Sequence, residues 1–275
     1  MNAASTTQSQ KAQRFQALHE RPGIFVIPNP WDVGSTKMLE KLGYEALATT
    51  SAGYAFSLGK LDGAVGLQQM IAHCKELCAA TTLPVSADLE NGFADEPKEA
   101  ARALILGAEA GLVGGSIEDY SGNPAKPTYD FTLAVERVQA AAEAVRKLPF
   151  KFMFAARADG LLHGTTDHDE IIRRLQAYEK AGADVLYAPG LKSLEEVRRV
   201  CSAVGKPVNV NMTSLPQASV AQIGEAGGKR ISTGGALARA AIGAMLRAGQ
   251  EMLGKGTFTW AAGAASGAEI KRLLG

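Results

Sequence analysis

The sequence has few cysteines, few aromatic residues and almost no net charge. Cys74, Cys78 and Cys201 are the three cysteines among 275 residues, and none lies in a Cys-x-x-Cys pair. This disfavours a disulfide-stapled fold and a structural zinc site, which needs four ligands. Lys and Arg exceed Asp and Glu by one. No overall positive field would therefore draw the protein to nucleic acid or to an anionic membrane.

Long apolar runs are also missing. No uncharged apolar stretch reaches about 18 residues, and residues 1–15 open on polar side chains rather than on the apolar core of a secretory signal. We therefore expect a cytoplasmic protein with no membrane partner that acts on a small molecule. Gly is plentiful, at 30 residues, in a chain that is 46% hydrophobic. This composition suits a large core with closely packed helices.

Short apolar runs recur along the chain, each followed by a turn cluster and a stretch with helical spacing. The eight runs are 25–28, 46–50, 84–88, 115–118, 152–156, 184–188, 207–211 and 229–233. They start about 29 residues apart on average, the length of one strand–helix unit. They predict an α/β fold, a (β/α)8 TIM barrel over 22–254, between an N-terminal arm (1–21) and a C-terminal helical tail (255–275). A doubly wound open sheet is the alternative, but no Gly-x-Gly-x-x-Gly follows the first run.

Acidic residues gather where the third and fourth runs end. Asp88 and Glu90 are two residues apart and so share one face of a strand, and Glu118 ends the next run. Because the carboxyl ends of barrel strands meet at one face, these carboxylates would repel one another unless a cation lay between them. Mg²⁺, or Mn²⁺ in its place, suits such oxygen ligands. The alternative is that the acids cap helices or face solvent.

The fifth run places Arg157 at the same end of the barrel. Its planar guanidinium can hold a carboxylate or a phosphate with two hydrogen bonds, so we interpret it as a substrate clamp. A structural ion pair with Asp159 or Glu118 is the alternative, and the two roles can coexist. Asn211 ends the seventh run on the same face. Among the histidines only His163, after the fifth run, lies near the predicted mouth.

Six motifs in chain order carry a family resemblance. They are Thr50-Ser51-Ala52-Gly53, Ser57-Leu58-Gly59-Lys60-Leu61-Asp62, Asp88-Leu89-Glu90-Asn91-Gly92, Ile117-Glu118-Asp119, Ala156-Arg157 and Asn211-Met212-Thr213. Together they resemble the phosphoenolpyruvate mutase/isocitrate lyase superfamily. The resemblance implies a barrel enzyme that breaks or makes a bond next to an enolate. It also implies a homo-oligomer, a dimer or a tetramer, with the eighth helix swapped between subunits.

The resemblance also assigns residues. It implies a Mg²⁺ site, partly through water, and a site for the carboxylate of an α-keto acid. The implied metal residues are Asp62, Asp88, Glu90 and Glu118, and the implied substrate-binding residues are Thr50, Ser51, Ala52, Gly53, Arg157 and Asn211. Arg157, Glu118 and Asp62 would be the catalytic residues.

The loop after the fourth run resembles the family's mobile lid. Its candidate residues are Tyr120, Asn123 and Lys126. The isocitrate and methylisocitrate lyases carry a catalytic Cys there, but no Cys occurs between residues 78 and 201. Phosphonate enzymes of the family carry a Lys followed by an Asn, whereas here Asn123 precedes Lys126.

These features predict a Mg²⁺-dependent enzyme that forms an enolate by cleaving a C–C bond in a small α-keto or 2-hydroxy dicarboxylate. Oxaloacetate decarboxylation or a 2-methylisocitrate lyase-like reaction would fit. Two alternatives stay open, namely a phosphonopyruvate-type P–C mutase or hydrolase and a catalytically silent barrel that binds an α-keto acid.

Overall fold

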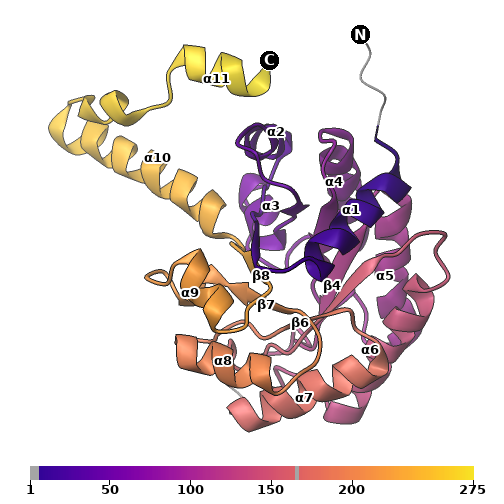
Figure 1. Ribbon diagram of the computed structural model, residues 1–275. Helices are drawn as coiled ribbons and strands as arrows, with labels where there is room; N and C mark the ends of the chain where they lie inside the picture. The colour runs from indigo at the N-terminus through magenta and orange to yellow at the C-terminus, as the bar shows by residue number, and fades with distance from the viewer. Residues whose placement is uncertain (1–5, 165–166) are drawn as a thin grey trace.

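The computed structural model describes residues 6–164 and 167–275, and its centre is a sheet of eight parallel strands. The strands are β1 (Phe25–Ile27), β2 (Leu47–Ala48), β3 (Val85–Asp88), β4 (Gly114–Glu118), β5 (Met153–Arg157), β6 (Val185–Tyr187), β7 (Val208–Asn211) and β8 (Arg230–Ser232). Their order in space is β1-β8-β7-β6-β5-β4-β3-β2. The Ala48 N–H donates to the Pro28 carbonyl (3.0 Å), which draws the two edges of the sheet together. The predicted (β/α)8 barrel is confirmed, and each predicted run overlaps one strand (Figure 1).

Helices alternate with the strands, and most of them cover the outside of the barrel. They are α1 (Gln8–Glu20), α2 (Val33–Lys41), α3 (Ser51–Ser57), α4 (Leu67–Ala79), α5 (Pro97–Glu109), α6 (Phe131–Val145), α7 (His168–Ala181), α8 (Leu194–Ser202), α9 (Val220–Glu225), α10 (Ala236–Lys255) and α11 (Gly267–Leu274), with short 3-10 helices at Met212–Ser214 and Thr259–Gly263. Capping side chains explain where several of them begin. Asp32, Asp167 and Ser193 each accept the N–H three residues on, which satisfies a donor that the first helical turn leaves free.

Strand alternation decides which side chains enter the barrel. On β5, Phe154 packs outward among the helices, whereas Ala155 packs inward. Arg157 is the next inward position toward the carboxyl end of β5. On β6, Val185 faces the interior, so Tyr187 is the next inward position there. The two residues are register partners, so they enter the mouth of the barrel at the same level.

Helix α1, in the predicted N-terminal arm, closes the amino end of the barrel. Residues 1–5 of that arm lie outside the described residues. Phe15 of α1 is fully buried and clusters with Met153 and Val185, the first inward residues of β5 and β6. A Cβ on Gly114 would lie 2.7 Å from the ring of Phe15. Glycine at the start of β4 therefore makes room for this ring.

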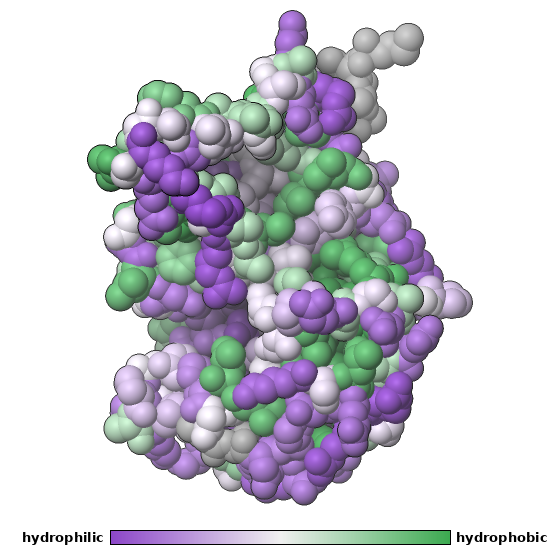
Figure 2. Space-filling model, turned by 90° about the vertical axis from the view of Figure 1, so that its left-hand side faces the viewer, coloured by the Kyte–Doolittle hydropathy of each residue, from purple (hydrophilic) through white to green (hydrophobic). Residues whose placement is uncertain are grey.

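Helix α10 follows β8 but leaves the barrel. Figure 1 shows it projecting away from the strands before the chain returns to place α11 beside α2. Ala238 and Ala248 are its buried residues, whereas Leu253 is 92% exposed. Figure 2 faces this side of the molecule and shows hydrophobic patches among polar side chains. Among the described helices, none is both long enough and apolar enough to cross a membrane.

Replacing Phe15 with Ala should destabilise the fold strongly. The change would leave a cavity between α1 and the interior of the barrel, and such truncations cost about 3–5 kcal/mol of unfolding free energy. Urea denaturation followed by circular dichroism measures this loss. Leu42→Ala, at a side chain that is 62% exposed, is the matched control and should change the unfolding free energy little. Equal losses in the two variants would contradict the packing described for α1.

Candidate active site

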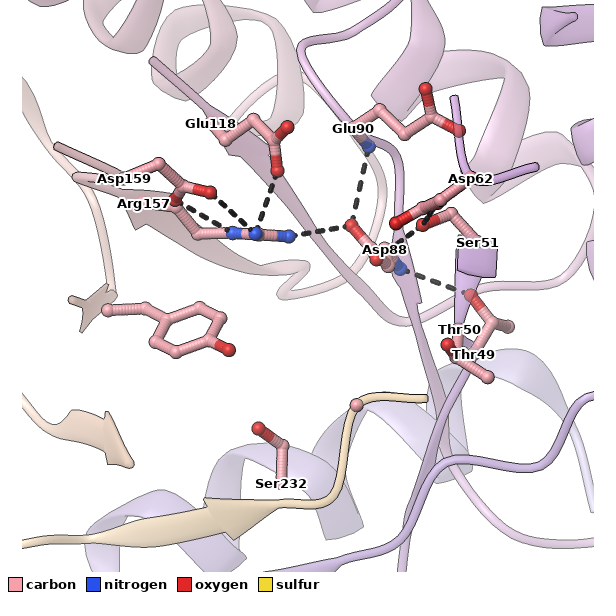
Figure 3. A network of polar contacts seen from close by, with 12 residues as sticks. Thr49, Thr50, Ser51, Asp62, Asp88, Glu90, Glu118, Arg157, Asp159 and Ser232 are labelled. Carbon is pink, nitrogen blue, oxygen red and sulfur yellow. Dashed lines mark hydrogen bonds and ion pairs between the residues drawn. The ribbon is translucent and has the colours of Figure 1, made fainter. Parts of the chain in front are cut away.

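Inward side chains from β3, β4 and β5 meet at one guanidinium. Arg157 Nη1 lies 2.9 Å from Asp88 Oδ1, and Arg157 Nη2 lies 2.8 Å from Glu118 Oε2 (Figure 3). Asp159 takes both Nε (3.2 Å) and Nη2 (2.8 Å) of the same guanidinium. The Arg157 side chain is only 12% exposed. One buried cation thus holds three carboxylates together at the mouth of the barrel.

A second, outward network fixes the loop that carries Asp159. The buried carboxylate of Asp119 accepts the Asp159 N–H (2.7 Å) through Oδ1. Its Oδ2 accepts the Arg174 guanidinium (2.9 Å) and the Tyr178 hydroxyl (2.7 Å), both from α7. Asp119 follows Glu118 directly, so the end of β4 supports the site on both of its faces. A buried charge with all of its partners in place is costly to move.

The other half of the cluster lies beside the loop after β2. The Ser51 hydroxyl is 3.0 Å from Asp88 Oδ2 and 3.2 Å from Asp62 Oδ1, so it links the two carboxylates. The Asp88 N–H donates to Thr49 Oγ1 (3.1 Å). Figure 3 shows the carboxylate of Glu90 on the Asp62 side of Asp88, away from Arg157. Glu90 Oε1 is buried and has no hydrogen-bond partner among the described residues.

The surroundings raise the pKa of three carboxyl groups in the cluster. Burial, together with the charges of Asp88 and Asp62, raises the pKa of Glu90 to about 8. Partial burial and the charge of Asp88 raise the pKa of Asp62. Burial also raises the pKa of Glu118 well above its ordinary range, although Arg157 acts in the opposite direction. More negative charge is gathered here than one guanidinium can neutralise, which is the condition that a cation relieves.

The donor set fits a cation that is held largely through water. In the part of the chain that the structure describes, no three His, Cys, Asp or Glu side chains lie close enough to ligate one ion directly. Mg²⁺ commonly keeps several waters and takes one or two protein carboxylates. Asp88 lies between the other acids, and the unpartnered Oε1 of Glu90 is an oxygen able to accept from a metal-bound water.

A cavity of about 650 Å³ opens beside these acids. Asp62, Glu90, Glu118 and Tyr120 are among the residues that line it. It opens between the loops that follow β2, β3 and β4, the usual position of a barrel active site.

The predicted lid residues divide into two groups. The Tyr120 ring lines the cavity and stacks on the His163 ring, with centroids 3.9 Å apart. Asn123 is exposed and accepts the Ala125 N–H, and Lys126 pairs with Asp130 (2.7 Å) in solvent. The structure therefore brings Tyr120 to the site, but not Asn123 or Lys126.

The turn after β2 lies at the edge of the cluster. Thr50 caps α3 by accepting the Gly53 N–H (3.2 Å). A Cβ on Gly53 would lie 2.6 Å from Thr50 and 2.9 Å from Trp31, so this glycine permits close packing. The N–H groups of Ser51 and Ala52 begin the helix and have no intrahelical acceptor.

One residue of the mouth was missing from the sequence prediction. Tyr187 of β6 lies under Arg157, and its hydroxyl accepts a hydrogen bond from Asn211 (3.0 Å). The ion pair of Arg157 with Asp159 that the sequence offered is present, and it uses two nitrogens of Arg157. The period of two along β6 was the available signal for Tyr187, since it gives this residue the inward position that Arg157 has on β5.

Comparison with known proteins agrees with this geometry. The family model described as phosphoenolpyruvate phosphomutase matches residues 15–253. A crystal structure of a Burkholderia cenocepacia J2315 protein, described provisionally as a lyase/mutase, is 52% identical, with a TM-score of 0.93 over 96% of this chain and 95% of that one. The crystal structure of a 2,3-dimethylmalate lyase is 28% identical, with a TM-score of 0.84 over 96% of this chain and 95% of that one.

Curated relatives extend the comparison to sequences. The Mycobacterium tuberculosis H37Rv protein Rv1998c is 31% identical over 220 residues, which cover 80% of this chain and 81% of that protein. The 2-methylisocitrate lyase of Halalkalibacterium halodurans is 29% identical over 213 residues, which cover 76% of this chain and 70% of that protein. With the barrel and the strand-end motifs described above, these matches show that the chain belongs to the phosphoenolpyruvate phosphomutase family and is an enzyme of the phosphoenolpyruvate mutase/isocitrate lyase superfamily.

Proposed function

We propose that the protein is a divalent-cation-dependent carbon–carbon lyase that forms an enolate from a small α-keto or 2-hydroxy dicarboxylate. The observation that carries the proposal is the excess of carboxylates around Arg157, with Glu90 Oε1 unpartnered beside a cavity. Relatives named as 2-methylisocitrate lyase and 2,3-dimethylmalate lyase support this class of reaction.

Asp62, Asp88, Glu90 and Glu118 would hold Mg²⁺, or Mn²⁺ in its place, partly through water. Bound there, the ion would neutralise negative charge that develops on the substrate oxygens as the bond breaks. The N–H groups of Ser51 and Ala52 lie on the side of Asp88 away from Arg157 and would donate to the substrate carboxylate. Arg157 would keep Asp88 and Glu118 in place and carry the balancing positive charge.

The lid would exclude water that protonates the enolate too early. Tyr120 both lines the cavity and stacks on His163, so this ring pair would hold the lid against the loop after β5.

Oxaloacetate decarboxylation is the reaction that we favour. The lid contains no Cys that could protonate a leaving group, and departure of CO₂ needs no protein acid. Phosphonate chemistry is the second candidate in the superfamily. It is less favoured because Lys126, the residue that would steady a phosphoryl group, is paired with Asp130 in solvent.

A substrate screen tests the proposal. Oxaloacetate, 2-methylisocitrate, 2,3-dimethylmalate and phosphonopyruvate would be incubated with the protein and Mg²⁺, with pyruvate release and ³¹P NMR as readouts. We expect pyruvate from a carboxylic acid and a rate at least about 100-fold lower in Asp88→Asn, because the central carboxylate is lost. Asp169→Asn, at a side chain that is 82% exposed, is the control and should retain full activity. Turnover of phosphonopyruvate alone would sink the assignment.

Glu90 should make cation binding depend on pH. Because the pKa of Glu90 is about 8 in the cation-free protein, its carboxyl carries a proton at pH 7. A bound cation favours the ionised form, so Mg²⁺ uptake should release a proton and tighten as pH rises from about 6 to about 8. Calorimetry in buffers of different ionisation enthalpy counts this proton. Glu90→Gln should lose the proton release, and equal wild-type affinity at the two pH values would contradict the expectation.

We also propose that a second copy of the chain covers α10. Met245, Leu246 and Leu253 of this helix are 65%, 55% and 92% exposed, and Phe258 just beyond it is 66% exposed. So many large apolar side chains along one projecting helix indicate an interface. A homodimer or a homotetramer in which α10 crosses to a neighbour would bury them.

Leu253→Asp should therefore lower the molar mass measured by light scattering after size-exclusion chromatography, because a charge would enter the interface. Val220→Asp on α9, at a residue that is 45% exposed, is the matched control and should keep the wild-type mass. A monomeric wild type, or a Leu253→Asp variant of unchanged mass, would rule out this interface.

A further inference from the structure

Tyr187 is a polar side chain at the mouth of the barrel to which the proposed function gives no role. It is the register partner of Arg157, and the Arg157 guanidinium carbon lies 5.0 Å from the centre of its ring. The residue is only 8% exposed. Tyr187 thus belongs to the same inward layer as the charged cluster. At this level β6 contributes a hydroxyl, whereas β3 and β4 contribute carboxylates.

The hydrogen bonds of Asn211 fix the direction of the Tyr187 proton. The backbone N–H of Thr213 lies 3.0 Å from Asn211 Oδ1, and a backbone N–H can only donate. Oδ1 is therefore the acceptor end of this amide, and the Nδ2 donor end faces Tyr187 Oη at 3.0 Å. Tyr187 Oη must accept that bond, so its own proton points elsewhere. Among the described residues, no acceptor for this proton is recorded.

Arg157 cannot complete carboxylate recognition alone. A guanidinium has five N–H donors. Three of them donate hydrogen bonds, from Nε and Nη2 to Asp159 and from Nη1 to Asp88. Glu118 Oε2 lies 2.8 Å from Nη2 as an ion pair. The second N–H of Nη2 lies on the nitrogen that is paired with Glu118, so only the second N–H of Nη1 belongs to a nitrogen with a donor to spare, whereas a carboxylate is best held by two donors. A protonated hydroxyl on the neighbouring strand would supply the second donor.

We propose that Tyr187 is a substrate-binding residue whose hydroxyl donates a hydrogen bond to a carboxylate oxygen of the substrate, beside the remaining N–H of Arg157. The inference rests on the proposed function, since it takes a small carboxylic acid as the ligand. Burial raises the pKa of Tyr187, so the hydroxyl keeps its proton at neutral pH. An acceptor supplied by the substrate would also satisfy a donor that is otherwise buried without a partner.

Tyr187→Phe tests the role because it removes the hydroxyl and keeps the ring against Arg157. Oxalate, a small dicarboxylate, is titrated into the protein by calorimetry with Mg²⁺ present. We expect the Kd for oxalate to rise about tenfold, as for the loss of one hydrogen bond to a charged group. Tyr44→Phe is the matched control, at a ring that packs in a separate apolar cluster around Leu39, and should leave the Kd unchanged. An unchanged Kd in Tyr187→Phe overturns the proposal.

A double-mutant cycle tests the direction of the proton. Asn211→Asp replaces the Nδ2 donor with an oxygen that would take the Tyr187 proton away from the substrate. We expect Asn211→Asp to weaken oxalate binding in the wild-type background and much less in the Tyr187→Phe background. Fully additive effects would overturn the proposal, because Asn211→Asp would then act through its own charge. If wild-type protein binds oxalate no better with Mg²⁺ than without it, the proposed function fails first, and this inference fails with it.

Discussion

The ion pairs of Arg157 are the interaction on which the mouth of the barrel depends. Three carboxylates from three segments, Asp88, Glu118 and Asp159, meet one guanidinium whose side chain is 12% exposed. Without this cation, the desolvation of those carboxylates and their mutual repulsion would oppose the approach of β3, β4 and β5. The pairing does not balance the charge, however, because Asp62 and Glu90 add two more acids on the far side of Asp88. The fold is thereby held together around a site that still favours a cation.

This charge arrangement divides the mouth into two functional halves. The loops after β2, β3 and β4 carry acids and border the cavity. β5, β6 and β7 carry Arg157, Tyr187 and Asn211. Arg157 donates to Asp88, and Asn211 donates to the Tyr187 hydroxyl. A small acid with two oxygen-bearing groups suits such a division, because one end can face a cation and the other can face donors. Asp119, which is bonded to α7 and to the Asp159 N–H, keeps the two halves of the mouth in a fixed relative position.

Much of this arrangement could be predicted from the sequence, because it follows local rules. The eight apolar runs marked the strands, and the period of two placed Asp88, Glu118 and Arg157 on inward faces at strand ends. The confirmed family resemblance rests on those same positions. The prediction of which residues border the cavity was weaker in the lid. Lys126 has a carboxylate four residues away in Asp130, and this local ion pair holds it in solvent.

The contacts that the sequence could not predict join residues far apart in the chain. Asp119 meets Arg174 and Tyr178, which lie 55 and 59 residues away, and no local pattern indicates such a partner. Tyr187 stands in an apolar run, and its importance depends on the parallel register that places it beside Arg157. The direction of its proton depends in turn on Asn211 and Thr213 at the end of β7, and the contact between Asn211 and Tyr187 forms only in the assembled barrel.

We infer that this charge excess, centred on Asp88, is a cation site. Electron paramagnetic resonance of Mn²⁺ measures it directly, because free Mn²⁺ gives a strong signal that bound Mn²⁺ loses. Titration of the wild-type protein should show one tightly bound Mn²⁺ per chain, displaced by excess Mg²⁺, and Asp88→Asn should lose it. A wild-type protein that binds no Mn²⁺, or an Asp88→Asn variant that binds it equally well, would show that Asp88 is not the centre of a cation site.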